Sequence, residues 1–196
     1  MILNDRSSTL SLLETRRSGR PREMIAPGPS EAELERILTI AARTPDHGKL
    51  FPWRFIIVST EQRQALADLL ASALPEVDPA AGPAHLQKAL EFAHQAPTLV
   101  VLVAAPVADH KIPLWEQQLS VGAAGMNLLI AAHALGYVGG WITGWAAYSE
   151  SVRSAFCGPG ERIAGFMFLG SPGAELLERP RAPLAAVAKP WTPPSA

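Results

Sequence analysis

The chain has 196 residues, of which 48% are hydrophobic and 18% charged, with 17 Lys and Arg against 18 Asp and Glu. This length favours one domain with one core, and the balanced charge gives no overall attraction to nucleic acid or anionic lipid. A single cysteine, Cys157, excludes an internal disulfide framework and a cysteine-rich zinc site. Because soluble chains average about 25% charged residues, the low share predicts that part of the surface is covered in an oligomer.

Two segments bear on where the protein resides. Residues 1–22 carry several charges and no apolar run, so we do not expect a secretory signal. Residues 118–148 are uncharged, but their helical part, 119–135, is shorter than the ~20 apolar residues that a bilayer requires. We therefore expect a cytoplasmic protein with no membrane span.

The predicted elements alternate between helices and strands. Leu10, Leu12 and Leu13 indicate a short amphipathic helix that ends in a basic cluster at 16–20. Ser30 and Glu33 form a capping box for a second helix, which Pro45 ends. The later elements are a strand at 53–59, helices at 60–74 and 84–94, a strand at 98–103, a helix at 114–135, a strand at 138–145, a helix at 149–156 and a strand at 162–169.

This order predicts a layered fold of the α/β or α+β class. We assign residues 1–171 to one domain and 172–196 to an extended C-terminal arm. The arm has neither helical nor strand periodicity, yet it carries the apolar residues Leu176, Leu177, Leu184, Val187 and Trp191. Since apolar side chains on an extended arm need a surface to cover them, we expect the arm to pack on a partner subunit.

The motifs of several enzyme classes are missing from the sequence. It contains no Gly-x-Ser-x-Gly elbow, no phosphate-binding loop and no dinucleotide-binding glycine motif after a strand. The five histidines lack ligand spacing, so we expect no metal site. Cys157 has Arg153 as its nearest basic residue in the sequence, which favours an unreactive thiol.

Arg16, Arg17 and Ser18 form the first candidate site. Guanidinium groups and a serine hydroxyl suit a phosphomonoester. The same residues can equally be a solvated helix end that the helix dipole favours. A nucleic-acid interface over residues 16–22 is a weaker alternative, because no aromatic residues are interleaved with the arginines.

Two further segments are candidates for ligand contacts. The polar loop 43–49 leads directly into a buried strand, a position where ligand contacts collect, although Asp46 can instead tie the backbone of its own loop. Residues 136–145 contain four glycines and two tryptophans, which suits a backbone that closely approaches a flat ring. Gly122 and Gly125 in the long helix indicate close packing by a ring, another backbone or a crossing helix.

These segments, in this order, resemble the nitroreductase family of FMN-dependent oxidoreductases, in particular its short bacterial members. The resemblance extends from about Leu10 to Trp191. It is carried by Arg16-Arg17-Ser18, Ala42–His47, Pro52-Trp53, His110–Pro113, Trp115-Glu116-Gln117, Gly139–Gly144 and Gly165–Pro172.

The resemblance implies an α+β, nitroreductase-like fold with a mixed central sheet flanked by helices. It also implies a homodimer with FMN at two sites between the subunits and NAD(P)H as the reductant. Arg16, Arg17 and Ser18 match residues that bind the phosphate and the polar edge of the flavin. Arg43 and His47 match residues that reach the flavin from the other subunit.

The remaining implied contacts lie later in the chain. Residues that would lie beside the flavin ring are Trp141, Ile142, Thr143 and Gly144, and a main-chain N–H of Thr143 or Gly144 would donate to N5 or O4. Arg181, within Arg179-Pro180-Arg181, matches a phosphate contact, and residues 131–136 match a contact to the nicotinamide nucleotide. Two departures from the family pattern bear on substrate choice: Phe51 stands where a polar residue is frequent, and Ile142 where a basic one is frequent.

Flavin chemistry also agrees with the missing motifs. Hydride transfer needs no protein acid, base or nucleophile, and a nearby guanidinium stabilises the negative charge of the reduced ring. We therefore expect no catalytic side chain, and a ping-pong oxidoreductase that reduces nitroaromatic, quinone-like or other electron-poor acceptors. The alternatives are a flavin enzyme of the same fold with another reaction, and a non-catalytic FMN-binding protein.

Overall fold

The computed structural model describes residues 2–194. The elements are α1 (Thr9–Thr15), η1 (Pro21–Glu23), β1 (Met24–Ile25), α2 (Glu31–Ala41), β2 (Trp53–Val58), η2 (Thr60–Gln62), α3 (Arg63–Val77), α4 (Pro83–Ala93), β3 (Thr98–Ala104), α5 (Leu114–Ala134), β4 (Val138–Ile142), η3 (Trp145–Ala147), α6 (Glu150–Phe156), β5 (Arg162–Pro172) and α7 (Leu184–Val187), where η marks a 3-10 turn. Every helix and strand expected from the sequence is present, and the α+β class is confirmed.

The sheet has the order β2-β3-β5-β4, and β1 pairs with the last two residues of β5. All pairings between described strands are antiparallel, so the expectation of a mixed sheet is wrong for this part of the chain. The reason lies in the order of the strands. β3 and β4, which α5 connects along the chain, run in the same direction. β5 lies between them in the sheet and is antiparallel to both.

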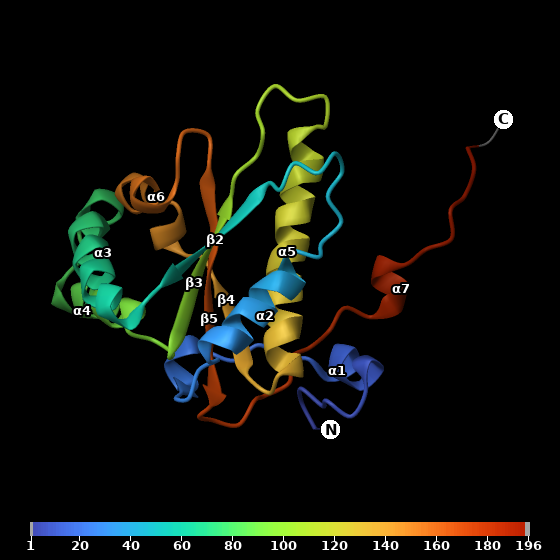
Figure 1. The fold of residues 1–196 in the computed structure, drawn as a ribbon, viewed down its shortest axis with the longest axis horizontal. Coiled ribbons are helices and arrows are strands. Elements are labelled where there is room, and N and C mark those ends of the chain that lie inside the picture. Colours follow the sequence, from blue (N-terminus) through green and yellow to red (C-terminus); the bar gives the residue numbers. More distant parts are fainter. Residues whose placement is uncertain (1, 195–196) are drawn as a thin grey trace.

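Helices cover both faces of the sheet, with α2 and α5 on one face and α3, α4 and α6 on the other (Figure 1). Side chains alternate between the two resulting cores. On β3, Leu99, Val101 and Val103 pack towards α3 and α4, whereas Val100 and Leu102 pack towards α5. Because both faces of this strand are covered, its sequence is an uninterrupted apolar run, as expected.

Three element boundaries differ from those predicted. The helix expected from Thr60 begins at Arg63 after a 3-10 turn, and it continues through Pro75 in its last turn, where the proline omits one main-chain hydrogen bond to the preceding turn. β4 ends at Ile142 because Gly144 adopts φ +68° and turns the chain into η3. β5 extends to Pro172 because it pairs there with β1, a two-residue strand too short to give a sequence signal.

α5 is 21 residues long, and no helix among residues 2–194 has both the length and the apolar character needed to cross a membrane. Its Gly125 explains part of the glycine pattern. A Cβ at Gly125 would lie 2.6 Å or less from the Trp141 ring, so a ring does pack there. Gly122, in contrast, has nothing within 4 Å of such a position.

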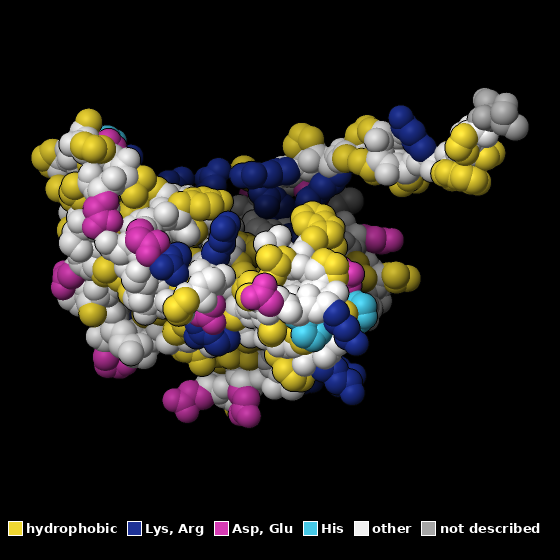
Figure 2. Space-filling view, turned by 90° about the horizontal axis from the view of Figure 1, so that it is seen from above, with side chains coloured by type: hydrophobic (Ala, Val, Ile, Leu, Met, Phe, Trp, Pro, Cys, Tyr) yellow, Lys and Arg dark blue, Asp and Glu magenta, His cyan; other side chains and the backbone are white. Residues whose placement is uncertain are grey.

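The chain leaves the body after β5 and forms the arm (Figure 1). Within residues 173–194, α7 is the single regular element, and Leu184, Val187 and Trp191 are 76%, 69% and 81% exposed. Figure 2 shows basic side chains gathered near the root of the arm and hydrophobic ones along it. Packing of these apolar residues on a partner subunit stays a prediction.

Candidate functional site

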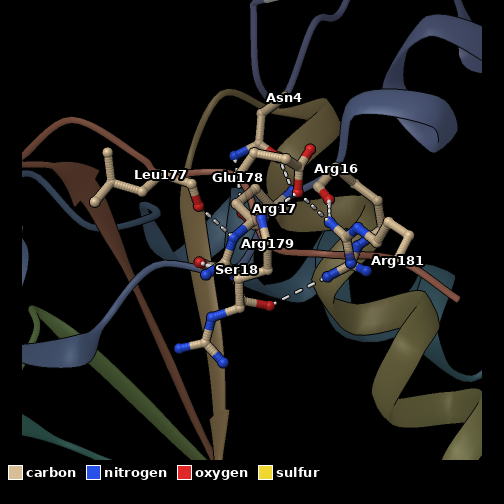
Figure 3. A network of polar contacts seen from close by, with 8 residues as sticks. All are labelled: Asn4, Arg16, Arg17, Ser18, Leu177, Glu178, Arg179 and Arg181. Atoms are coloured by element: carbon tan, nitrogen blue, oxygen red, sulfur yellow. Dashed lines mark hydrogen bonds and ion pairs between the residues drawn. The ribbon is translucent and has the colours of Figure 1, made fainter.

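Arg16, Arg17 and Ser18 lie where α1 ends, and the arm brings Arg179 and Arg181 to them (Figure 3). Arg16 Nη2 donates a hydrogen bond to Ser18 Oγ at 3.2 Å. Arg181 Nη2 donates to the main-chain oxygen of Arg16 at 3.3 Å, across 165 residues of sequence. The structure therefore brings together Arg16, Ser18 and Arg181, which the sequence placed in one site. We call Arg16, Arg17, Ser18, Arg179 and Arg181 the arginine cluster.

The cluster carries more positive charge than its surroundings neutralise. Burial, followed by the charges of Arg181 and Arg17, lowers the pKa of Arg16, and Glu178 is the acidic group that opposes this shift. Arg16 Nε is buried and has no hydrogen-bond partner among the described residues. A buried unpaired donor within a group of arginines is what a phosphate oxygen would satisfy, so these residues fit the phosphate end of FMN.

Arg17 differs from Arg16 in its contacts. Its Nε donates to the main-chain oxygen of Leu177 at 2.7 Å, and its Nη1 donates to that of Ser18 at 2.9 Å. Burial and the charges of Arg179 and Arg181 lower the pKa of its guanidinium. In this structure, Arg17 attaches the root of the arm to the end of α1.

The second candidate, loop 43–49, lies along α5, with contacts from Glu116 in its first turn to Asn127. Ser120 Oγ donates to the main-chain oxygen of Pro45 at 2.6 Å, and Asn127 Nδ2 donates to Thr44 Oγ1 at 2.9 Å. Thr44 is buried and also donates to the main-chain oxygen of Ala41. The sequence analysis did not assign these roles to Ser120 and Asn127, although two polar residues seven positions apart on one face of an apolar helix are a signal for such contacts.

The side chains of this loop differ in what they contact. Asp46 accepts a hydrogen bond from the main-chain N–H of Phe51 at 2.8 Å. It therefore ties the backbone next to its own loop, as the alternative to a ligand contact predicted. His47 Nδ1 lies 2.7 Å from Glu116 Oε2. Arg43 and His47 are both exposed, which leaves them available to another molecule.

His47 of the loop and the arginine cluster lie at opposite ends of α5. His47 contacts Glu116 in the first turn of the helix, whereas Arg16 lies close enough to His133, near the helix end, to lower its pKa. Seventeen residues separate these two helix positions, which at 1.5 Å per residue is about 25 Å. A single chain therefore does not bring His47 to the cluster.

β4 connects the cluster to the third candidate segment. The main-chain oxygen of Gly139 accepts from Gly19 N–H at 3.1 Å, and Gly139 N–H donates to His133 Nε2 at 3.2 Å. A Cβ at Gly140 would lie 2.9 Å from the Gly19 oxygen, so a glycine is required for this close approach. The segment that follows Ser18 therefore lies directly against β4.

The outer edge of β4 presents main-chain groups beyond this contact. The N–H and C=O of Gly139 point away from β5, and alternation along the strand directs those of Trp141 the same way. The Trp141 ring instead packs towards α5, with its Nε1 donating to the main-chain oxygen of Ala164 at 2.9 Å. Any ligand at this edge would thus meet the backbone of Trp141 and not its indole.

A cavity of about 620 Å³ opens where β4 ends, between that strand and helices α3 and α4. This volume lies within the range of small-molecule sites. The predicted ring contacts Ile142, Thr143 and Gly144 line it, and Thr143 and Gly144 are exposed. Its other lining residues include the apolar Leu74, Phe92 and Trp145 and the charged Arg22, Lys88 and Glu91.

Residues 131–136 do not form an accessible contact surface. Ala131, Ala132 and His133 are buried in the body, so Ala134 and Gly136 are the exposed members of the stretch. Burial lowers the pKa of His133 to about 4, and its Nδ1 has no partner among residues 2–194. A nicotinamide-nucleotide contact here gains no support from the geometry.

Two expectations concern groups outside these segments. Among residues 2–194, no group of three or more His, Cys, Asp and Glu side chains is placed to hold a metal ion. Burial and the nearby Glu161 raise the pKa of the Cys157 thiol, which agrees with an unreactive cysteine.

Comparison with known proteins gives a consistent result. The model of the nitroreductase family matches residues 13–171. A Haemophilus influenzae protein named "Putative NAD(P)H nitroreductase" is 40% identical over 172 residues, which cover 87% of this chain and 91% of that protein.

Solved structures share the fold at lower sequence identity. A nitroreductase-like family protein from Bacillus cereus superposes with a TM-score of 0.81 at 20% identity, covering 93% of this chain and 95% of that one. A variant of NfnB from sphigopyxis sp. strain HMH, described as an FMN and NADPH-dependent nitroreductase, gives a TM-score of 0.71 at 20% identity over 93% of this chain and 98% of that one.

Proposed function

Since the chain belongs to the nitroreductase family, we propose that it is an FMN-dependent NAD(P)H oxidoreductase. Its acceptors would be nitroaromatic, quinone-like or other electron-poor compounds. The name of the Haemophilus influenzae relative supports NAD(P)H as the reductant, and the description of NfnB supports FMN as the cofactor.

The observation that carries the proposal is the buried Nε of Arg16, which is unpaired within the part of the chain that the structure describes. Its buried position beside Ser18 and Arg181 provides donors from several directions to one anion. Guanidinium groups bind phosphate oxygens through pairs of charge-assisted hydrogen bonds. We assign the FMN phosphate to Arg16, Ser18 and Arg181, whereas Arg17 holds the arm that supplies Arg181.

The edge of β4 would hold the flavin ring. Gly139 adjoins the segment after Ser18, and Thr143 lies four residues further along, about 13 Å at the usual rise of a strand. FMN, with phosphate at one end and ring at the other, can bridge such a distance. The main-chain N–H groups of Thr143 and Gly144 would orient the ring, and the cavity beside Ile142 would receive it.

The second subunit would complete each site. His47 contacts the first turn of α5, about 25 Å along the helix from the cluster end, so it would serve a cluster on another chain, and Arg43 of the same loop would accompany it. Apolar side chains at the surface of the single chain support a homodimer. These are Leu10, Trp115 and Leu119, at 70%, 66% and 54% exposed, together with the apolar residues of the arm.

FMN, when bound, supplies a ring that accepts a hydride and returns electrons to a second substrate. The protein's own part is binding and orientation. Positive charge from the arginine cluster balances the phosphate, and the β4 backbone fixes the ring without presenting an acid or base. This division agrees with the lack of the hydrolase and metal motifs in the sequence.

The absorption spectrum of the purified protein tests the function directly. We expect a yellow protein whose flavin band bleaches when NADH or NADPH is added without oxygen and returns when a nitroaromatic or quinone is added. Protein that takes up no FMN would contradict the cofactor assignment. Bound FMN that no reduced nicotinamide bleaches would identify a non-catalytic FMN-binding protein instead.

A further inference from the structure

The end of α1 lacks the usual features of a helix C-terminus. The residue after the helix, Arg16, has φ −58° and ψ 131°, so the chain turns at once into an extended conformation. A glycine in the left-handed conformation, which commonly satisfies the last carbonyl groups of a helix, is not used here. Another segment must therefore satisfy the main-chain groups that lead into the arginine cluster.

Asn4 satisfies them with three hydrogen bonds. Its main-chain N–H donates to the oxygen of Thr15 at 3.1 Å. Its side-chain Oδ1 accepts from Arg17 N–H at 2.7 Å, and its Nδ2 donates to the Arg17 oxygen at 3.1 Å. The side-chain amide thus binds both main-chain groups of Arg17, as a neighbouring strand would, and Figure 3 shows it directly beside the cluster.

The conformation of Asn4 agrees with this role. Its φ is +54°, in the left-handed region that asparagine tolerates better than most residues. The next residue continues the attachment, because Asp5 N–H donates to Thr15 Oγ1 at 2.9 Å. Asn4 and the buried Thr15 together fix the segment 2–5 to the end of α1.

The position of Arg17 determines the geometry of its neighbours. Arg16 and Ser18 share peptide units with it, so a change in the Arg17 main chain would move both the buried guanidinium and the hydroxyl that it contacts. Residues 2–12 also lie outside the stretch that the family model matches. The Asn4 contact is therefore a feature of this chain beyond the matched family core.

We propose that Asn4 is a positioning residue for the phosphate end of the cofactor site, holding Arg16 and Ser18 in the orientation that binds the anion. This inference rests on the proposed function. Asn4 would not touch FMN itself. It would act through the main chain of Arg17, and its influence would be confined to the phosphate and not extend to the ring.

Two substitutions at this position separate the side chain from the backbone conformation. Asn4→Ala removes the amide and strains the left-handed backbone, whereas Asn4→Gly removes the amide at a residue that adopts positive φ freely. Ser7→Ala is the matched control, because Ser7 lies in the same segment and its hydroxyl contacts Ser11 and not the cluster. Dissociation constants for FMN and for riboflavin, which lacks the phosphate, are measured for each protein, with circular dichroism to verify folding.

We expect both Asn4 variants to bind FMN about tenfold more weakly, as two lost hydrogen bonds allow, and to bind riboflavin as the unsubstituted protein does. Unchanged FMN affinity in Asn4→Gly would overturn the proposal, as would an equal loss of affinity for FMN and riboflavin. Failure of the proposed function would look different. The unsubstituted protein would then bind neither flavin, and the positioning role would fall with it.

Discussion

The arginine cluster lies near the C-terminal end of α5 and loop 43–49 lies along the helix towards its first turn, and these two charged regions are built in different ways. The cluster draws on three segments that are distant in sequence: residues near Asn4, residues 16–18 and the root of the arm at 177–181. The loop is a local connection between α2 and β2, fixed by Ser120 and Asn127 from the helix beneath it.

The two regions also differ in which of their polar groups are ordered and which are exposed. The cluster is ordered within one chain and holds a buried donor that has no partner among residues 2–194, which supports the proposed anion site. In the loop, the backbone is ordered while Arg43 and His47 remain exposed. A single chain thus contains an ordered group of arginines and, in its exposed loop side chains, a separate set of polar groups that we propose serves the site of another copy.

The largest expected effect concerns His133, which is buried near the C-terminal end of α5, the end close to the arginine cluster. Its pKa of about 4 in the folded protein lies below the ordinary 6.5. Between these pH values, the unfolded state binds more protons than the folded state, so the free energy of unfolding falls as the pH decreases from 6.5 to 4. The contribution of the neutral His133 to stability is fully present above pH 6.5. The loss attributable to His133 is about 3 kcal/mol.

Denaturant unfolding at pH 7 and pH 4 measures this loss. His133→Gln keeps an oxygen that can accept from Gly139 N–H but cannot titrate, so its unfolding free energy should fall about 3 kcal/mol less over this interval. Equal losses of unfolding free energy in the two proteins would show that the pKa of His133 is not lowered in the folded protein. Comparing FMN retention at the two pH values would show whether acid affects the cluster first.

Arg16→Ala should have the next largest effect. If this half-buried guanidinium binds the phosphate as proposed, removing it should raise the dissociation constant of FMN about 30- to 100-fold, or about 2–3 kcal/mol. Arg16→Lys should retain part of the affinity, because an ammonium supplies charge without the planar pair of donors. Titration of FMN by fluorescence measures both, and equal binding by Arg16→Ala would remove this residue from the site.

Substituting the loop should cost less. Arg43→Ala combined with His47→Ala should weaken FMN binding about tenfold, because these side chains are exposed and can contribute from the rim of a site. The unfolding free energy should stay nearly unchanged, since neither side chain is buried. A large drop in stability would mean that the loop is structural.

Mixing the two variants tests whether the regions cooperate between chains. In a heterodimer of Arg16→Ala with the Arg43→Ala, His47→Ala double variant, an intersubunit arrangement places both defects in one site and leaves the other site intact. Random pairing of an equal mixture makes about half of the dimers heterodimers, each with one intact site of two, so we expect about a quarter of the FMN sites to bind tightly after mixed refolding. If each site were built within one chain, every site would carry one defect and no tight binding would return.

The sequence predicted elements best where local patterns determine them. The capping box at Ser30 and Glu33 is present, and the uninterrupted apolar run of β3 is covered on both faces. The short strand β1 and the Asn4 contact were not predicted, because neither has a periodic signal. Both depend on a partner that is distant along the chain, Pro172 for β1 and Arg17 for Asn4.

The candidate site divides in the same way. The basic residues, the polar loop and the glycine-rich strand were evident from residue types and spacing. Their placement was not: the Trp141 ring packs against α5 and away from the strand edge, and Arg17 binds the main-chain oxygens of Leu177 in the arm and of its neighbour Ser18. Side-chain direction depends on the packing of neighbouring elements, which residue spacing does not specify.

The sequence by itself determined the alternation of helices and strands, the fold class and the family, because hydrophobic periodicity and ordered motifs are properties of neighbouring residues. The tertiary structure alone decided that the described strands pair antiparallel, that Arg16 and Arg181, 165 positions apart, meet in one cluster and that His47 lies at the other end of α5. Those features are set by how the chain folds back on itself, and contacts between distant segments leave no periodic trace in the order of the residues.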